Sequence, residues 1–176
     1  MLDYFAYGSN MLTARLVARC PGARARGRGR VRGFTVAYAK VGRDGSGKAT
    51  LLTAGGVVEG VVFAIPAAEV ANLDEAEGLG RGYDRITLTA EMGERADRPA
   101  PATRPVFSYI ATAPTPGLLP FVWYRDLILA GIAEHGLPPA VAAWHRAARA
   151  VDDPDPESQG RRAALAALAG GPPKPS

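Results

Sequence analysis

Strand-like segments follow one another along this 176-residue chain with little helix between them. In these segments β-branched and aromatic residues predominate, and glycine or proline bounds most of them. Six segments fit this description: residues 1–6, 26–41, 49–54, 57–65, 83–90 and 104–111. Because several are neighbours in the sequence, we predict an α+β domain with a small sheet that is mostly antiparallel or barrel-like.

Helical spacing of apolar residues predicts helices over residues 11–19, 67–77, 121–135 and 139–150, with an Ala-rich fifth helix over 160–169. Pro66 opens the second helix at its first turn, where its missing N–H costs little, and Gly78 ends it. We expect residues 1–150 to form one domain. Residues 151–176 would be a C-terminal extension, a short helix with a flexible tail, and residues 95–103 a connector.

The stretch Tyr4–Met11 joins the first strand to the first helix through a glycine turn. Gly8 lets the backbone approach whatever lies above the turn, and Asn10 is a residue type that caps helices well. A strand that enters a helix in this way presents several free backbone N–H groups at one point. Such a point favours an anion or a polarised carbonyl oxygen.

Glu77 is expected at the C-terminal end of the helix 67–77, directly before Gly78. The helix dipole opposes a negative charge at this end, and Asp74 and Glu75 add repulsion between like charges. An exposed acidic helix end is the commoner explanation of such a cluster. The alternative is a carboxyl group whose environment suits proton transfer.

Residues 42–48 nearly match the phosphate-binding P-loop. Gly42, Gly47 and Lys48 fit that pattern, but Ala49 stands where a magnesium-binding hydroxyl is required. The segment that follows is also too short for the expected helix. We therefore interpret 42–48 as a hairpin loop between two strands.

Five arginines alternate with small residues in one segment: Arg24, Arg26, Arg28, Arg30 and Arg32. Alternation places them on one face of an extended segment, which suits either a row of phosphate contacts or an arginine-rich solvent face. Lysine occurs only three times while arginine, alanine and glycine abound, which indicates a compositional bias. No aromatic residues interleave the arginines, so we favour the solvent face and expect no nucleic-acid partner.

Cysteine and histidine are too rare for a zinc site, and the acidic residues at 151–157 are expected to form a solvated turn. Cys20 is interpreted as a buried structural residue, His135 as a cation at a helix end, and His145 as a packing or surface residue. No segment reaches the ~18–20 apolar residues of a membrane span, and no secretory signal is visible. We expect a cytoplasmic protein without membrane contact.

Three separated motifs stand in an order that is typical of one enzyme family. They are Tyr4-Phe5-Ala6-Tyr7-Gly8-Ser9-Asn10, then Leu73-Asp74-Glu75-Ala76-Glu77-Gly78 with Tyr83 shortly after, then Tyr124 ahead of Gly131 and Glu134-His135-Gly136-Leu137-Pro138. Together they resemble the γ-glutamylcyclotransferase family. The resemblance extends to about residue 140, and its most specific element is the Tyr-Gly-Ser-Asn turn.

This resemblance implies a small mixed barrel with flanking helices, and no metal or organic cofactor. It implies cyclisation of a γ-glutamyl group to 5-oxoproline, in which the substrate's own α-amine attacks its γ-carbonyl and an amine or amino acid leaves. Glu77 matches the family's catalytic glutamate, which would take a proton from the α-ammonium and later protonate the leaving amine. Because the nucleophile belongs to the substrate, no Ser-His or Cys-His pair is needed.

Substrate binding is implied by the same resemblance for Tyr4, Phe5, Ala6, Tyr7, Gly8, Ser9 and Asn10, and for Tyr83, Tyr109 and Tyr124. Backbone N–H groups of the turn would hold the oxyanion of the tetrahedral intermediate or the substrate carboxylate. The loop between Glu77 and Tyr83 is one residue shorter than in animal members. Residues 42–48 and those beyond 150 follow no family pattern and are expected to shape the leaving-group side.

Several alternatives stay open. The leaving group would be a free amino acid, a γ-glutamyl-lysine-type amine or a secondary-metabolite amine, and the protein a monomer or a homodimer. The alternative to an enzyme is a non-catalytic module with the same fold that binds a ligand or a partner. A nucleic-acid binder that uses the arginines between 24 and 32 is a third, less favoured hypothesis.

Overall fold

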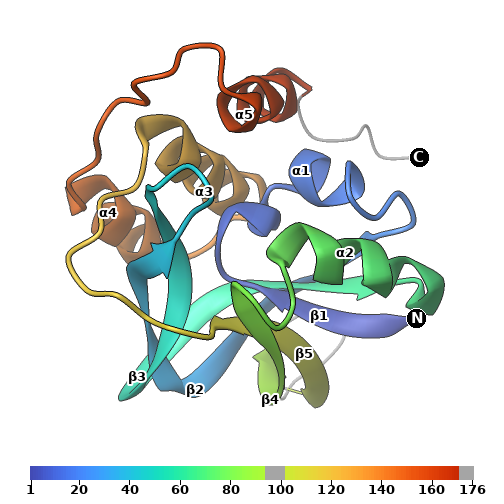
Figure 1. Cartoon of the computed structure of the whole chain (residues 1–176). Coiled ribbons are helices and arrows are strands. Elements are labelled where there is room, and N and C mark those ends of the chain that lie inside the picture. The colour runs from blue at the N-terminus through green and yellow to red at the C-terminus, as the bar shows by residue number, and fades with distance from the viewer. Residues whose placement is uncertain (94–101, 171–176) are drawn as a thin grey trace.

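The computed structural model describes residues 1–93 and 102–170, which form a closed five-stranded barrel surrounded by helices (Figure 1). The strands are β1 (Leu2–Ala6), β2 (Arg24–Val41), β3 (Gly47–Ile65), β4 (Tyr83–Met92) and β5 (Thr103–Ala111). Their order around the barrel is β1-β3-β2-β4-β5. The pairs are antiparallel except that β5 meets β1 in parallel, at Tyr4 and Phe107. The predicted α+β, barrel-like fold is confirmed.

The barrel has five strands in the described part of the chain, where the sequence predicted about six. The predicted strands 49–54 and 57–65 are one continuous strand, β3, which passes through Gly55 and Gly56. The glycines do not break the strand because β2 pairs with β3 on both sides of them. The register shifts between Arg32, which pairs with Val57, and Phe34, which pairs with Thr53. Gly33 lies at this bulge with φ +85°.

The helical segments are η1 (Ser9–Met11), α1 (Thr13–Val17), η2 (Ala67–Glu69), α2 (Val70–Glu77), α3 (Val122–Glu134), α4 (Pro139–Ala147) and α5 (Gln159–Ala169). The predicted helix 11–19 is thus a 3₁₀ turn followed by a short helix. Asn10 lies inside the 3₁₀ turn and caps neither segment, because its side chain bonds to residues outside the helix. The predicted connector and tail fall largely outside the described residues, which omit 94–101 and 171–176.

Two glycines bring neighbouring elements into close contact with the turn after β1. A Cβ atom at Gly131 of α3 would lie 2.6 Å from the backbone nitrogen of Leu12. A Cβ atom at Gly60 of β3 would overlap the carbonyl oxygen of Ala6. Since only glycine leaves enough room at these contacts, α3 and β3 together fix the path of the chain through residues 6–12.

The acidic segment after α4 is more than a solvated turn. The Asp153 carboxylate accepts hydrogen bonds from the indole nitrogen of Trp123 (2.9 Å) and from the hydroxyl of Ser158 (2.6 Å). Ser158 in turn caps α5 by accepting from the backbone nitrogen of Arg161. These bonds connect the start of α5 to α3, and α5 packs against α3 and α1 (Figure 1).

Several arginines of β2 contact other parts of the molecule. Arg30 and Arg32 both contact the Glu91 carboxylate, and Arg28 donates to the carbonyl oxygen of Gly136 (2.9 Å). This supports the interpretation of the row as a strand face.

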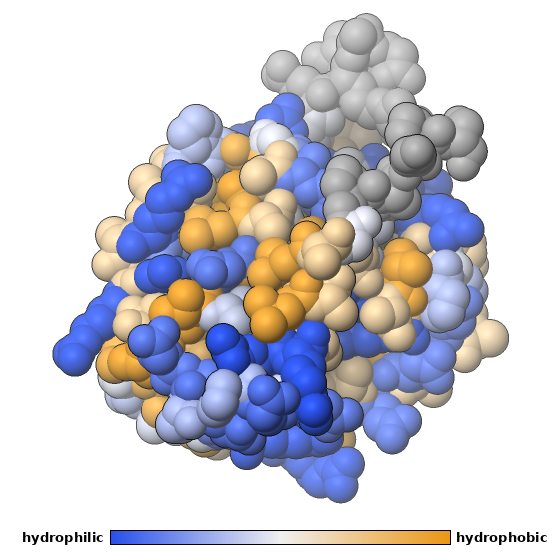
Figure 2. All heavy atoms as spheres, turned by 90° about the horizontal axis from the view of Figure 1, so that it is seen from above, coloured by the Kyte–Doolittle hydropathy of each residue, from blue (hydrophilic) through white to orange (hydrophobic). Residues whose placement is uncertain are grey.

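On the face seen from above, Figure 2 shows hydrophilic and apolar side chains mixed together. Among the helices described, none is long and apolar enough to span a membrane.

Candidate active site

The glycine turn and the carboxylate that the sequence suggested separately meet in the structure. α2 ends at Glu77, and Gly78 follows in the left-handed conformation (φ +70°) that commonly terminates helices. The Asn10 amide nitrogen lies 2.9 Å from Oε1 of Glu77. The turn after β1 and the end of α2 therefore form two walls of one site.

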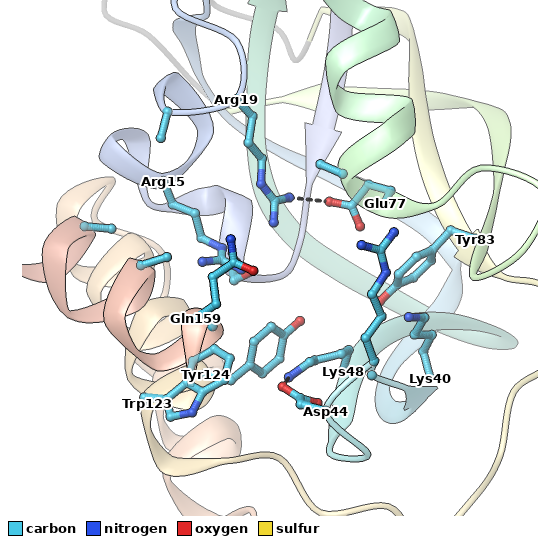
Figure 3. A pocket seen from close by; sticks show the side chains of 18 residues that line it. Arg15, Arg19, Lys40, Asp44, Lys48, Glu77, Tyr83, Trp123, Tyr124 and Gln159 are labelled. Atoms are coloured by element: carbon cyan, nitrogen blue, oxygen red, sulfur yellow. Dashed lines mark hydrogen bonds and ion pairs between the residues drawn. The ribbon is translucent and has the colours of Figure 1, made fainter. Parts of the chain in front are cut away.

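A small polar network holds the Glu77 carboxylate. Asn10 donates to Glu77 and also to the hydroxyl of Tyr4 (3.1 Å), while its carbonyl oxygen accepts from Arg19 (3.0 Å). The Arg19 guanidinium itself lies 2.6 Å from Oε1 of Glu77 (Figure 3). Sequence reasoning missed Arg19, since one arginine at the end of a helix gives no indication of its partner.

The expected crowding of carboxylates around Glu77 is relieved in the structure. Asp74 accepts a hydrogen bond from the Tyr109 hydroxyl (2.7 Å) and pairs with Arg85 (3.4 Å). Glu75 is exposed to solvent. The charge nearest to Glu77 is the cation Arg19 rather than another carboxylate.

A small inner cavity of about 30 Å³ opens beside Glu77. It is lined by Tyr4, Tyr7, Gly8, Ser9, Asn10, Ala49, Glu77, Tyr83, Tyr109 and Tyr124. All predicted site residues line it except Phe5 and Ala6, which are fully buried in the core. Tyr83 lies in the cavity wall despite the short loop before it.

The five tyrosines of the cavity are neutral phenols near neutral pH, because burial raises the pKa of each. Three of them donate their hydroxyl protons to the protein: Tyr7 to the Tyr109 carbonyl, Tyr83 to the Ala49 carbonyl and Tyr109 to Asp74. The hydroxyls of Tyr4 and Tyr124 instead accept, from the Asn10 amide and from the Ala49 backbone nitrogen. Their own protons are available to a bound ligand.

A larger outer pocket of about 470 Å³ continues from the inner cavity (Figure 3). The two share Ser9, Glu77, Tyr83 and Tyr124. The outer walls come from the tip of the β2–β3 hairpin, the start of α3 and the inner face of α5. Asp44, Lys48 and Gln159 in this lining belong to the regions 42–48 and beyond 150, which the sequence analysis expected to shape the leaving-group side. Sequence reasoning did not identify Arg15 of α1, Lys40 of β2 or Trp123 of α3.

The P-loop-like segment is a hairpin turn, as predicted. Two of its backbone N–H groups bond within the turn, from Gly42 to the Ser46 carbonyl (2.7 Å) and from Gly45 to the Gly42 carbonyl (3.0 Å), while Gly47 donates to the Leu119 carbonyl (2.8 Å). Lys48 pairs with Asp44 (2.7 Å), and its ammonium lies over the ring of Trp123, 4.6 Å from the centroid. This lysine is packed against the start of α3 instead of being presented to a phosphate.

The histidines and the cysteine lie outside the cavity. His135 faces the hydroxyl of Thr13 (3.2 Å) and burial lowers its pKa, so it is neutral rather than the expected cation at a helix end. His145 is a packing residue, 2% exposed, and Cys20 is buried, which raises the pKa of its thiol. Across residues 1–93 and 102–170, no three His, Cys, Asp or Glu side chains gather to hold a metal ion.

The fold and the site define a small α+β barrel protein with a polar pocket beside one carboxylate. The chain belongs to the γ-glutamyl cyclotransferase, AIG2-like family, whose model matches residues 4–120. It is 29% identical to the γ-glutamylcyclotransferase of Mus musculus over 141 residues, which span 77% of this chain and 72% of the mouse protein. It is 30% identical to the Bos taurus γ-glutamylcyclotransferase over 142 residues, with the same coverage.

Solved structures give the same result. A structure described as a γ-glutamyl cyclotransferase superposes with a TM-score of 0.81 at 26% identity, covering 92% of this chain and 95% of the other. The human protein loc79017 superposes with a TM-score of 0.80 at 27% identity and the same coverage. The family model ends before Tyr124 and α5, so the outer pocket is partly built from residues beyond it.

Proposed function

We propose that this protein is a γ-glutamylcyclotransferase, which converts a γ-glutamyl group to 5-oxoproline and releases an amine or amino acid. Membership of the family and the similarity to named γ-glutamylcyclotransferases support this activity. One observation at the site carries the assignment of the base. The cavity lining combines neutral tyrosines with a single carboxylate, Glu77, so Glu77 is the side chain of that lining suited to act as the general base.

The chemistry needs one proton to move twice. Glu77 removes a proton from the substrate's α-ammonium, and the free amine attacks the γ-carbonyl carbon. The bond from that carbon to the leaving nitrogen breaks as Glu77 returns the proton to the leaving nitrogen, and the tetrahedral intermediate collapses. The ring nitrogen carries two protons after the attack, and it gives one of them to the released amine or to solvent as the lactam forms. Asn10 and Arg19 hold the carboxylate in place throughout. Because the attacking and leaving groups both belong to the substrate, the protein contributes positioning and proton transfer.

The negative charge that develops on the γ-carbonyl oxygen requires hydrogen-bond donors. Gly8 precedes the 3₁₀ turn, and the N–H groups of Ser9 and Asn10 begin it, where no partner exists within the turn. The hydroxyl protons of Tyr4 and Tyr124 are further donors. One such donor is typically worth about 3 kcal/mol of transition-state stabilisation. We assign this loop to the γ-glutamyl group and its oxyanion.

Substitution of the base is the direct test. We expect Glu77→Gln to fold normally and to lose at least about 10²-fold in kcat, because the amide cannot take the proton. The matched control is Glu75→Gln, which removes an exposed carboxylate two residues away on the same helix. The measurement is 5-oxoproline released from a panel of γ-glutamyl amino acids and amines.

A folded Glu77→Gln protein that keeps the wild-type rate would contradict the assignment of the base. Measurable binding of γ-glutamyl compounds by the wild type without any 5-oxoproline would instead favour a non-catalytic binding module on this fold.

A further inference from the structure

The space around Glu77 carries an excess of positive charge. The outer pocket is lined by five cationic side chains and two carboxylates: Arg15, Arg19, Lys40, Arg43 and Lys48, with Asp44 and Glu77. An adjoining pocket of about 530 Å³ shares Lys40, Arg43 and Glu77 with it and adds Arg81. The part of a ligand that extends from the inner cavity past Glu77 therefore enters a basic environment in either of the two pockets.

Two of these cations are already neutralised. Arg19 pairs with Glu77 at 2.6 Å and Lys48 pairs with Asp44 at 2.7 Å. In the part of the chain that the structure describes, no carboxylate pairs with Arg15, Lys40 or Arg43. Within residues 1–93 and 102–170, the one side-chain hydrogen bond of Arg15 runs from its Nε to the hydroxyl of Ser9 (3.0 Å).

These three cations surround the carboxylate rather than the tyrosine-lined cavity, since none of them lines that cavity. A Cβ atom at Gly82 would lie 3.2 Å from Nζ of Lys40, and one at Gly78 would lie 3.9 Å from Nη2 of Arg43. Both cations thus lie beside the turn that follows Glu77. Figure 3 shows Arg15 on one side of the open space, and Lys40 and Lys48 on the other.

Charge balance then limits what the pocket accepts. The γ-glutamyl end of a substrate carries an α-ammonium and an α-carboxylate, whose charges cancel, so it does not compensate these cations. A leaving group with one carboxylate compensates only one of them. An amine with extra positive charge, such as a polyamine, would be repelled.

We propose that the outer pocket is specific for leaving amines that carry two anionic groups, with Arg15, Lys40 and Arg43 as the residues that select them. This proposal rests on the proposed function. Acidic amino acids have this chemistry, and so do amines with a phosphate or sulfonate in addition to a carboxylate. Opposite charges in a recessed pocket also raise the rate of encounter, by about 10- to 10³-fold in general.

The test compares two substrates of nearly equal shape, γ-glutamyl-L-glutamate and γ-glutamyl-L-glutamine, which differ in one negative charge. We expect kcat/KM for the glutamate compound to be at least about 10-fold higher at low ionic strength, and the ratio to shrink as salt is added. Nα-γ-glutamyl-L-lysine should be slower than both. Equal values for the glutamate and glutamine compounds would overturn the proposal while leaving the proposed function intact.

Two charge variants test whether the preference for the glutamate compound arises from the pocket. Arg43→Gln should lower the glutamate-to-glutamine ratio several-fold, because Arg43 is an exposed cation at the mouth of the pocket. Arg146→Gln removes the same charge from α4, outside the pocket lining, and should leave the ratio unchanged. An equal effect of the two variants would show that only the net charge matters, against the proposal.

Measuring the affinity for the dipeptides tests the selectivity of the pocket independently of catalysis. Glu77→Gln should bind both dipeptides, and calorimetry should show at least about 10-fold tighter binding of the glutamate compound. If the wild type releases 5-oxoproline from no member of the γ-glutamyl panel, these dipeptides included, the proposed function fails, while this preference in binding still supports the pocket. Equal affinities would overturn the pocket assignment whatever the activity.

Discussion

At the scale of single residues, two tyrosines bond to the backbone of the same residue, Ala49, and are expected to differ in function. Tyr83 donates its hydroxyl proton to the carbonyl oxygen of Ala49 (2.8 Å), and the Tyr124 hydroxyl accepts from the backbone nitrogen of Ala49 (3.1 Å). Both side chains are buried in the wall of the inner cavity. Their structural contributions are therefore similar, but of the two only Tyr124 does not donate its hydroxyl proton to Ala49.

Phenylalanine at each position separates these contributions. Both Tyr83→Phe and Tyr124→Phe should lower the free energy of unfolding by about 1 kcal/mol, since each loses one hydrogen bond. Tyr124→Phe should in addition lower kcat by about 10- to 100-fold, while Tyr83→Phe changes it little. Denaturant unfolding and the 5-oxoproline assay measure the two effects. If both variants lose the same activity, Tyr124 has only a structural role.

At the scale of elements, α3 supports the turn after β1. Gly131 lies where α3 crosses η1, and a Cβ atom there would lie 2.7 Å from both the carbonyl carbon and the Cβ atom of Met11. Two of these close neighbours are backbone atoms, Leu12 nitrogen and the Met11 carbonyl carbon, so they cannot move aside as a flexible side chain would. A larger residue must separate the helix from the turn that carries Ser9 and Asn10.

We expect Gly131→Ala to lower the free energy of unfolding by about 1–3 kcal/mol, as overpacking of a dense core does. It should also lower kcat, because the displaced turn moves Asn10 away from Glu77. Alanine favours helices by about 1 kcal/mol over glycine, so the measured loss is a net value. Gly55→Ala is the control, since nothing lies within 4 Å of a Cβ atom there. A Gly131→Ala protein with wild-type stability and rate would show that the contact is loose.

At the scale of the whole molecule, stability should depend on pH through a buried histidine. His145 is 2% exposed, its Nδ1 lies 2.7 Å from the Tyr38 hydroxyl, and burial lowers its pKa from 6.5 to about 4. The unfolded chain takes up a proton below pH 6.5, but the folded chain does so only below about pH 4. The free energy of unfolding should therefore fall as the pH is lowered through this window.

The expected loss from this one group is about 3 kcal/mol between pH 7 and pH 4, since one pKa unit corresponds to about 1.4 kcal/mol. His145→Gln should be less stable than the wild type at pH 7.5 and should lose less stability on acidification. Urea unfolding of both proteins at pH 7.5 and pH 4.5 measures the difference. Identical losses in the two proteins would show that other groups cause the acid sensitivity.

The sequence predicted those features that depend on neighbours along the chain. Glycine after Glu77 ends α2, Pro66 precedes the helical segments before it, and alternating apolar residues produce the long strands. The Tyr-Gly-Ser-Asn turn and Glu77 were identified as the site because they match family motifs, and the structure brings them to one cavity. Local conformational preferences and short motifs are properties of the sequence itself.

The tertiary structure decided what depends on contacts between distant segments. Glu77 has Arg19 as its partner across 58 positions, and Asp74 faces Tyr109 across 35. The two predicted strands 49–54 and 57–65 are one strand because β2 pairs with both. Helix α5 forms a wall of the outer pocket because it packs against α3 and α1, and Asp153 and Ser158 connect its start to α3. No local preference specifies which side chains meet across the barrel, since many pairings satisfy the same pattern of apolar and polar residues.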